Sequence, residues 1–193
     1  MNKLIIDWHK FYSYVHILTR EITLSGWKPD YIVGINRGGL IPAVMLSHYF
    51  NIPMKTLMVS LRDGGECVSD CGMAEDALGY PKQERFVEIN IEEVLEVASG
   101  FLERSAPYKN ILIVDDINDT GATFNWIMND WKTSCLPNDE DWKWVWNNNV
   151  RFAVIVDNLA SKCDIKVDYK ALEINKAENN VWVDFPYESW WER

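Results

Sequence analysis

The stretch ILIVDDINDTGAT, residues 111–123, decides the fold of this chain. It begins with four apolar residues, 111–114, which run directly into the carboxylates Asp115 and Asp116, and a third carboxylate follows at Asp119. A short apolar run that ends in polar residues is typical of a buried parallel strand. Ligands of open α/β sheets bind at the carboxyl ends of such strands. The stretch therefore predicts a strand that delivers acidic side chains to a binding site.

The four residues after Asp119 suit a phosphate group. Thr120, Gly121, Ala122 and Thr123 supply small side chains, backbone N–H groups and two hydroxyls at the predicted start of a helix. Ordinary helix capping explains one or two of these residues, but not three carboxylates followed by Thr-Gly-Ala-Thr. The sequence contains neither GxxxxGK[ST] nor GxGxxG, so the competing phosphate-binding motifs are excluded.

This stretch resembles the signature of type I phosphoribosyltransferases. The resemblance implies that the substrate is 5-phosphoribosyl-1-pyrophosphate (PRPP), with the 5-phosphate bound by Thr120, Gly121, Ala122 and Thr123. It also implies that Asp115 and Asp116 hold the ribose hydroxyls, and that Asp116 is the protein group nearest to Mg²⁺, the expected cofactor. Asp119, by the same resemblance, lies near N7 of a purine and acts as the general base.

A second motif follows the first predicted sheet strand, residues 31–35. Arg37 is followed by Gly38 and Gly39. Glycine lets the backbone approach oxygen atoms closely, and arginine offers a fixed fork of donors to phosphate. The motif resembles the pyrophosphate loop of the family, which implies that Arg37 and Gly38 bind PRPP and that the Arg37–Gly38 junction carries a strained or cis peptide bond.

A third motif, VWVDFPYE at residues 181–188, resembles the Trp-Ile/Val-x-x-Pro-Trp segment of bacterial xanthine-guanine phosphoribosyltransferases. That resemblance implies that Trp182 stacks on the purine and that the main chain of Val183 reads its edge. The chain has ten tryptophans, so a place in the core is the alternative for Trp182. Asn158 stands where the 6-oxopurine enzymes have a lysine that donates to O6. Because an amide either donates or accepts, Asn158 leaves the choice between 6-oxo and 6-amino purines open.

Apolar periodicity predicts alternating strands and helices along the chain. Asp7 is the expected N-cap of a helix that ends near Ile22. The remaining predicted helices cover residues 40–49, 91–104 and 122–131, and the predicted strands cover residues 31–35, 54–59, 85–91, 111–114 and 150–157. Residues 133–149 read as irregular. This alternation indicates a doubly wound α/β fold, with helices on both faces of a parallel sheet.

A polar stretch interrupts this pattern at residues 62–84, which contain four glycines. It is typical of a mobile loop, and the resemblance to the family places that loop at about residues 61–85, where it closes over the site to exclude water. Three cationic residues of this loop are candidates for contacting the pyrophosphate: Arg62, Lys82 and Arg85. We include Arg85 in the predicted PRPP site. The N- and C-terminal segments are expected to form a small hood.

Length and composition favour a single enzyme domain spanning residues 1–193. With 48% hydrophobic residues the chain is not disordered, and its net charge of −10 argues against a nucleic-acid or anionic-membrane partner. No apolar run is long enough to cross a membrane. The four cysteines show no CxxC spacing, which favours reduced thiols and a cytoplasmic location: Cys67, Cys71, Cys135 and Cys163.

The resemblance as a whole implies purine salvage. A Mg²⁺-dependent purine phosphoribosyltransferase transfers the 5-phosphoribosyl group of PRPP to a purine base and releases pyrophosphate. Its expected partners are these small molecules and further copies of the chain, as a homodimer or homotetramer. Two alternatives stay open: a regulatory protein that senses PRPP, and a transferase for a pyrimidine or another non-purine acceptor. Trp182 argues against the latter.

Overall fold

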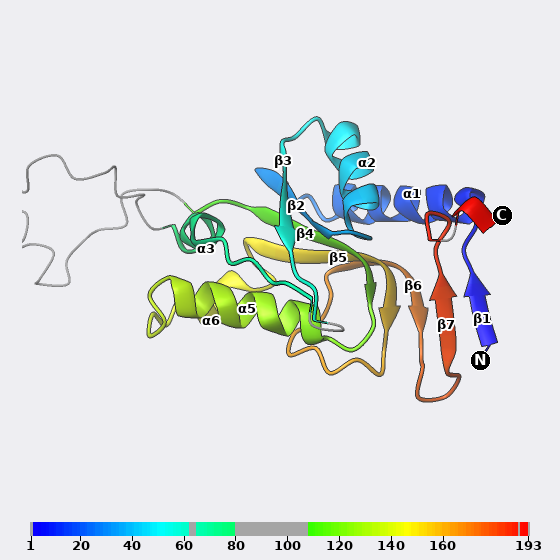
Figure 1. The fold of residues 1–193 in the computed structure, drawn as a ribbon. Coiled ribbons are helices and arrows are strands. Elements are labelled where there is room, and N and C mark those ends of the chain that lie inside the picture. The colour runs from blue at the N-terminus through cyan, green and yellow to red at the C-terminus, as the bar shows by residue number, and fades with distance from the viewer. Residues whose placement is uncertain (1, 62–64, 80–107, 189, 193) are drawn as a thin grey trace, which may run out of the picture.

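The computed structural model describes residues 2–61, 65–79, 108–188 and 190–192. At its centre lies a five-stranded sheet in the order β3–β2–β4–β5–β6, in which every neighbouring pair is parallel (Figure 1). The strands are β2 (Tyr31–Asn36), β3 (Met54–Met58), β4 (Ile111–Asn118), β5 (Val150–Asn158) and β6 (Tyr169–Ile174). The predicted α/β fold with a parallel sheet is confirmed.

Helices cover both faces of this sheet, as the alternating pattern predicts (Figure 1). On one face, α1 (Trp8–Leu24) and α2 (Leu40–Phe50) pack over a core that includes Ile32 and Leu112. On the other face, α3 (Cys71–Leu78), α5 (Ala122–Ser134) and α6 (Trp142–Val145) pack over a second core. The two faces of β4 contribute alternate residues to the two cores, which explains why its apolar run is continuous.

The first helix forms where its sequence pattern predicts. Asp7 is the N-cap, and its Oδ1 accepts a hydrogen bond of 2.8 Å from the backbone N–H of Lys10. Its buried face consists of residues spaced three or four apart, which places them on one side of a helix: Phe11, Val15, Leu18, Thr19 and Ile22.

A second, smaller sheet joins the two ends of the chain. The strands β1 (Asn2–Ile5) and β7 (Val181–Asp184) pair in parallel, and Lys3 lies opposite Trp182. Figure 1 shows both termini at this end of the molecule, with the C-terminus beside the start of α1 and the N-terminus at the opposite end of β1. A short 3₁₀ helix, Trp190–Glu192, follows. The two terminal segments thus pair with each other, and their role as a hood stays a prediction.

Two described helices lie in stretches where none was predicted. The helix α3 lies within the stretch that reads as a polar loop: Asp70 caps it through a 3.0 Å hydrogen bond to the N–H of Met73, and Gly79 ends it with a φ of 74°. Its buried apolar residues pack against α5, a tertiary contact that a polar composition conceals. The short helix α6 likewise lies within the stretch 133–149 that was expected to be irregular.

Several predictions concern residues outside those described. They are the strand 85–91, the helix 91–104 and the loop cations Arg62, Lys82 and Arg85. Within the described ranges, no helix combines the length and the apolar character that crossing a membrane requires.

Candidate active site

Three loops meet at the carboxyl edge of the central sheet. They follow β2, β4 and β5, which are neighbouring parallel strands and therefore end on the same side. The loop after β2 carries Arg37, the loop after β4 carries Asp119, and the loop after β5 begins next to Asn158. The topology thus brings together motifs that lie far apart in the sequence.

The two helices that begin at this edge both have glycine at the N-cap. Gly39 is the N-cap of α2 and Gly121 is the N-cap of α5, so neither N-cap residue has a side chain to cap its helix, and at the start of α5 the N–H of Ala122 donates to Oγ1 of Thr120 at 3.3 Å. By contrast, α1 and α3 are capped by the carboxylates of Asp7 and Asp70. Uncapped N–H groups at a helix N-terminus are available to an anion. Both predicted phosphate-binding segments therefore lie where the backbone favours negative charge.

Gly38 and Gly39 allow the loop after β2 to lie directly against the end of β4. A Cβ on Gly38 would lie 1.8 Å from Oδ2 of Asp116, and a Cβ on Gly39 would lie 2.4 Å from the carbonyl oxygen of Val114. Any side chain at these positions would collide with the strand. The cis peptide bond of this loop lies between Asn36 and Arg37. The expected position at the Arg37–Gly38 junction is therefore wrong by one residue.

The turn after β4 is supported by the loop after β5. Gly121 has a φ of 85°, and a Cβ there would lie 2.3 Å from the backbone nitrogen of Cys163. The backbone N–H of Lys162 donates to the carbonyl of Thr120 at 2.9 Å, and Nδ2 of Asn125 donates to the carbonyl of Lys162 at 2.8 Å. These contacts fix the turn from both sides, so the N–H groups that follow it have a defined direction.

Asp115 and Asp116 differ in their surroundings. Asp115 is 9% exposed, and its Oδ1 accepts a hydrogen bond of 2.9 Å from the N–H of Asp116. Oδ2 of Asp116 accepts a hydrogen bond of 2.8 Å from the phenol of Tyr187. Burial raises the pKa of Asp116, and the hydrogen bond from Tyr187 opposes that rise. Burial and the charge of Asp116 raise the pKa of Tyr187, so its phenol keeps the proton that it donates.

Asp119 forms an ion pair with a residue that the sequence motifs did not single out. Nζ of Lys176, which follows β6, lies 2.7 Å from Oδ1 of Asp119. Both side chains are partly shielded, with 16% of Lys176 and 21% of Asp119 exposed. The pair places a hydrogen-bond donor directly beside the carboxylate that is expected to act as the base.

Asn158 is buried, with 4% of its surface exposed, and its amide bonds to the backbone on both sides. Its Nδ2 donates to the carbonyl of Asp119 at 2.7 Å, and its Oδ1 accepts from the N–H groups of Ala160 at 3.2 Å and Lys176 at 3.0 Å. The side chain thus holds the two segments that carry the Asp119–Lys176 pair. Its role as reader of purine position 6 stays a prediction.

Trp182 and Val183 lie next to each other on β7 and face different surroundings. Trp182 is 41% exposed, so it does not belong to either core. Val183 is 6% exposed and packs in the core beneath α1. A half-exposed indole is available for stacking on a flat ring.

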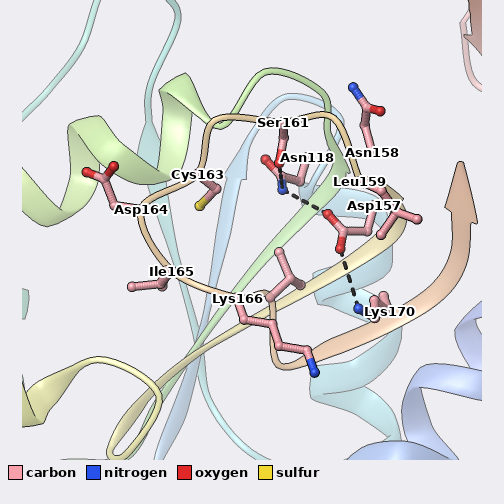
Figure 2. A pocket seen from close by; sticks show the side chains of 11 residues that line it. Asn118, Asp157, Asn158, Leu159, Ser161, Cys163, Asp164, Ile165, Lys166 and Lys170 are labelled. Atoms are coloured by element: carbon pink, nitrogen blue, oxygen red, sulfur yellow. Dashed lines mark hydrogen bonds and ion pairs between the residues drawn. The ribbon is translucent and has the colours of Figure 1, made fainter. Parts of the chain in front are cut away.

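A hollow of ≈ 380 Å³ lies under the loop that follows β5 (Figure 2). Nδ2 of Asn118 donates to Oδ1 of Asp157 at 2.8 Å and to Oγ of Ser161 at 3.0 Å, and Nζ of Lys170 lies 3.6 Å from Oδ2 of Asp157. Figure 2 shows the amide of Asn158 directed away from this network. Asp119 and the turn after it do not line the hollow, whereas Asn158 does.

Comparison with known proteins agrees with this geometry. The family model of the phosphoribosyl transferase domain matches residues 2–190. The chain belongs to the phosphoribosyltransferase family. The hypoxanthine-guanine phosphoribosyltransferase of Schizosaccharomyces pombe is 30% identical over 130 residues, which are 61% of this chain and 57% of that protein. The chain thus matches little more than half the length of this relative.

Two solved structures are similar to this phosphoribosyltransferase over nearly their whole length. The purine phosphoribosyltransferase of Pyrococcus horikoshii has a TM-score of 0.58 at 22% identity, covering 97% of this chain and 95% of that one. The xanthine-guanine-hypoxanthine phosphoribosyltransferase of Helicobacter pylori has a TM-score of 0.60 at 14% identity, covering 99% of this chain and 97% of that one. At these identities the likeness shows a shared type I phosphoribosyltransferase fold.

A Mg²⁺ ion at this site of the phosphoribosyltransferase would be held by carboxylates of the signature. Among the described residues, no three His, Cys, Asp or Glu side chains converge as a metal-binding group. The three signature carboxylates are therefore not a dedicated cage. Mg²⁺ is usually held by one or two carboxylates together with substrate phosphates, and Asp115 and Asp116 fit that smaller role.

Two residues of the site were missed by sequence reasoning. Lys176 stands two residues beyond the end of β6, and only the fold brings it to Asp119. For Tyr187 the sequence does contain an indication, because this residue occupies the second aromatic position of the Trp-x-x-x-Pro-aromatic motif that begins at Trp182. A tyrosine there adds a hydroxyl, and a hydroxyl beside a carboxylate signature marks a potential hydrogen bond.

Proposed function

We propose that this phosphoribosyltransferase transfers the 5-phosphoribosyl group of PRPP to a purine base, forming a nucleoside 5-monophosphate and pyrophosphate. One observation carries the proposal: the ion pair of Asp119 and Lys176, 2.7 Å apart, beside the glycine turn of a phosphoribosyltransferase signature. The pair offers an acceptor and a donor side by side. A purine with a 6-oxo group presents the complementary pair, a ring N7–H next to an O6 acceptor.

PRPP lies across the carboxyl edge of the sheet in this proposal. Its 5-phosphate binds the backbone N–H groups of residues 120–123 and the hydroxyls of Thr120 and Thr123, at the start of α5, whose N-cap is Gly121. Its pyrophosphate binds Arg37 and the backbone of Gly38, at the uncapped start of α2.

The ribose hydroxyls bind Asp115 and Asp116, whose negative charge stabilises the positive charge that develops at C1. Asp116 is also the group that would hold Mg²⁺, and the ion would supply positive charge against the polyphosphate. Arg85 is retained as a further pyrophosphate contact on the basis of the family resemblance.

The base stacks on Trp182 and meets the main chain of Val183. Its N9 attacks C1 with a lone pair, the bond from C1 to the pyrophosphate oxygen breaks, and that oxygen keeps the electron pair. The proton on N7 passes to the carboxylate of Asp119 as the ring gains positive charge. Lys176 donates to the exocyclic oxygen, a role that its three N–H donors suit better than the buried and already bonded amide of Asn158.

The rest of the proposal follows the family resemblance. We take residues 1–193 as one phosphoribosyltransferase domain that works in the cytoplasm on small molecules as a homodimer or homotetramer, in purine salvage. Its net charge of −10 supports the exclusion of nucleic acid and anionic membranes as partners.

Product analysis tests the proposed reaction. The protein is incubated with PRPP, Mg²⁺ and hypoxanthine, and the mixture is separated by chromatography and identified by mass spectrometry. We expect inosine 5-monophosphate to appear in equal amount with pyrophosphate, and only when all three components are present. PRPP that is bound but never consumed, with any base, would favour the sensor alternative.

A further inference from the structure

Tyr187 connects the C-terminal segment to the signature of the enzyme. Its phenol donates a hydrogen bond of 2.8 Å to Oδ2 of Asp116. Its ring stacks on Phe185 with centroids 5.5 Å apart and an interplanar angle of 6°, and meets the edge of Phe11 at 5.7 Å. Trp8 lies 6.5 Å from the same ring. Aromatic rings of α1 and the C-terminal segment thus hold the phenol in place, so the position of its hydroxyl is defined by packing.

The carboxylate that Tyr187 contacts is also enclosed from a second side. Gly38 lies so close that a Cβ there would fall 1.8 Å from Oδ2 and 3.1 Å from Oδ1 of Asp116. Three separate segments therefore meet at one carboxylate: the end of β4, the loop after β2 and the segment after β7. The carboxyl torsion of an aspartate is intrinsically broad, and here the hydrogen bond and the close glycine restrict it.

We propose that Tyr187 is the positioning residue for Asp116, holding Oδ2 against Gly38 so that the carboxylate is already oriented for the ribose hydroxyls and for the Mg²⁺ that it would help to hold. The proposal rests on the proposed function, because it assigns the sugar and its Mg²⁺ as the ligands of Asp116. A carboxylate that is already oriented binds a diol without the cost of ordering itself. Tyr187 does not touch the reacting atoms in this account.

The competing explanation is that Tyr187 only fills space in the hood. Its ring packs among other aromatic rings in both accounts, so loss of the ring would impair the protein either way. Removal of the hydroxyl alone distinguishes the positioning role from the packing role. Tyr187→Phe keeps the ring and removes the hydrogen bond, while Tyr12→Phe removes a hydroxyl from a 48% exposed tyrosine that stacks on Trp8, outside the site.

Isothermal calorimetry with PRPP and Mg²⁺, together with steady-state kinetics, tests the assignment. For Tyr187→Phe we expect the Kd and the KM for PRPP to rise about tenfold, the typical loss of a hydrogen bond to a charged group. The KM for the base should change less than about twofold, and the melting temperature should stay within about 2 °C of the parent. Tyr12→Phe should match the parent in all four measurements.

A double-mutant cycle with Asp116 gives a second test, whose expected result would not follow if Tyr187 only filled space. In an Asp116→Ala background, Tyr187→Phe should change PRPP affinity by less than about twofold, because the acceptor of the Tyr187 hydrogen bond is already absent. Equal PRPP binding by the parent and Tyr187→Phe would overturn the inference, as would independent losses in the cycle. A parent protein that fails to bind PRPP with Mg²⁺ would instead contradict the proposed function.

Discussion

Asp119 and Lys176 are joined twice, once through their side chains and once through Asn158. Nζ of Lys176 lies 2.7 Å from Oδ1 of Asp119, and the amide of Asn158 donates to the carbonyl of Asp119 and accepts from the N–H of Lys176. The buried asparagine therefore holds the backbones in the register that the ion pair needs. A lysine therefore lies beside Asp119 even though position 158, where the 6-oxopurine enzymes have their lysine, carries an asparagine.

The first prediction concerns the base. Asp119→Asn removes the acceptor of the N7 proton while it preserves the shape of the side chain. We expect kcat to fall about 100-fold or more, and the Kd for PRPP with Mg²⁺ to change little, because Asp119 acts on the purine and not on the sugar. Pre-steady-state turnover and calorimetric titration measure the two quantities. A variant with the parent kcat across the pH range would remove Asp119 from the chemistry.

The second prediction concerns Lys176. An ammonium group donates and never accepts, so it favours O6 of hypoxanthine and guanine over the amino group of adenine. Lys176→Gln should lower kcat/KM for the two 6-oxopurines about tenfold, while kcat/KM for adenine stays the same or rises.

Lys166→Gln is the matched control, since Lys166 is an exposed lysine on the loop between β5 and β6. It should leave all three bases unchanged. If Lys176→Gln lowered every base equally, the lysine would serve the carboxylate and not the exocyclic group.

The third prediction concerns Trp182. Stacking carries little information about substituents, so Trp182→Ala should weaken the binding of every purine by about 1–3 kcal/mol and leave their ranking unchanged. Competition binding of several purines to the PRPP complex measures this. Trp144→Ala is a suitable control, because Trp144 is 45% exposed and lies in α6 on the far face of the sheet. Normal purine affinity in Trp182→Ala would assign the stacking role elsewhere.

The fourth prediction concerns stability. Asp76 on α3 is 7% exposed, and its carboxylate meets Nζ of Lys109 at 2.9 Å, Nζ of Lys55 at 3.4 Å and the phenol of Tyr31 at 3.2 Å. Asp76→Ala leaves the buried phenol without this acceptor and releases α3 from the sheet. We expect the free energy of unfolding to fall by about 2 kcal/mol.

Chemical denaturation followed by circular dichroism measures this loss. Glu21→Ala, which removes an exposed carboxylate from α1, should change the unfolding free energy by less than about 0.5 kcal/mol. Equal stability of Asp76→Ala and the parent would show that α3 is held by its apolar face alone.

The part of the fold that was predictable is the part with strong periodicity. The apolar run before Asp115 is buried on both faces in β4, and the spacing of Phe11, Val15, Leu18 and Ile22 matches the buried side of α1. Local patterns of this kind follow directly from burial. The polar composition around α3 concealed a helix, because four of its residues pack against the core while their neighbours remain polar.

The candidate site was predictable wherever a motif is continuous in the sequence. Arg37, Asp119 and their neighbours lie at the carboxyl edge of the sheet, as the strand-turn-helix pattern requires. Lys176 and Tyr187, by contrast, lie far in the sequence from the carboxylates that they contact, Asp119 and Asp116. Their roles depend on which strand ends are neighbours, and the order β4–β5–β6 and the pairing of β1 with β7 are properties of the folded chain.

The rate of pyrophosphate release from PRPP and Mg²⁺ with a panel of acceptors tests the central claim most directly. The panel is hypoxanthine, guanine, xanthine, adenine, uracil and orotate, with a no-base control and a control in excess EDTA. The account predicts the highest kcat/KM for 6-oxopurines, a lower value for adenine, none for the pyrimidines and none without metal. Release that is equal for all acceptors, or fastest with a pyrimidine, would contradict it.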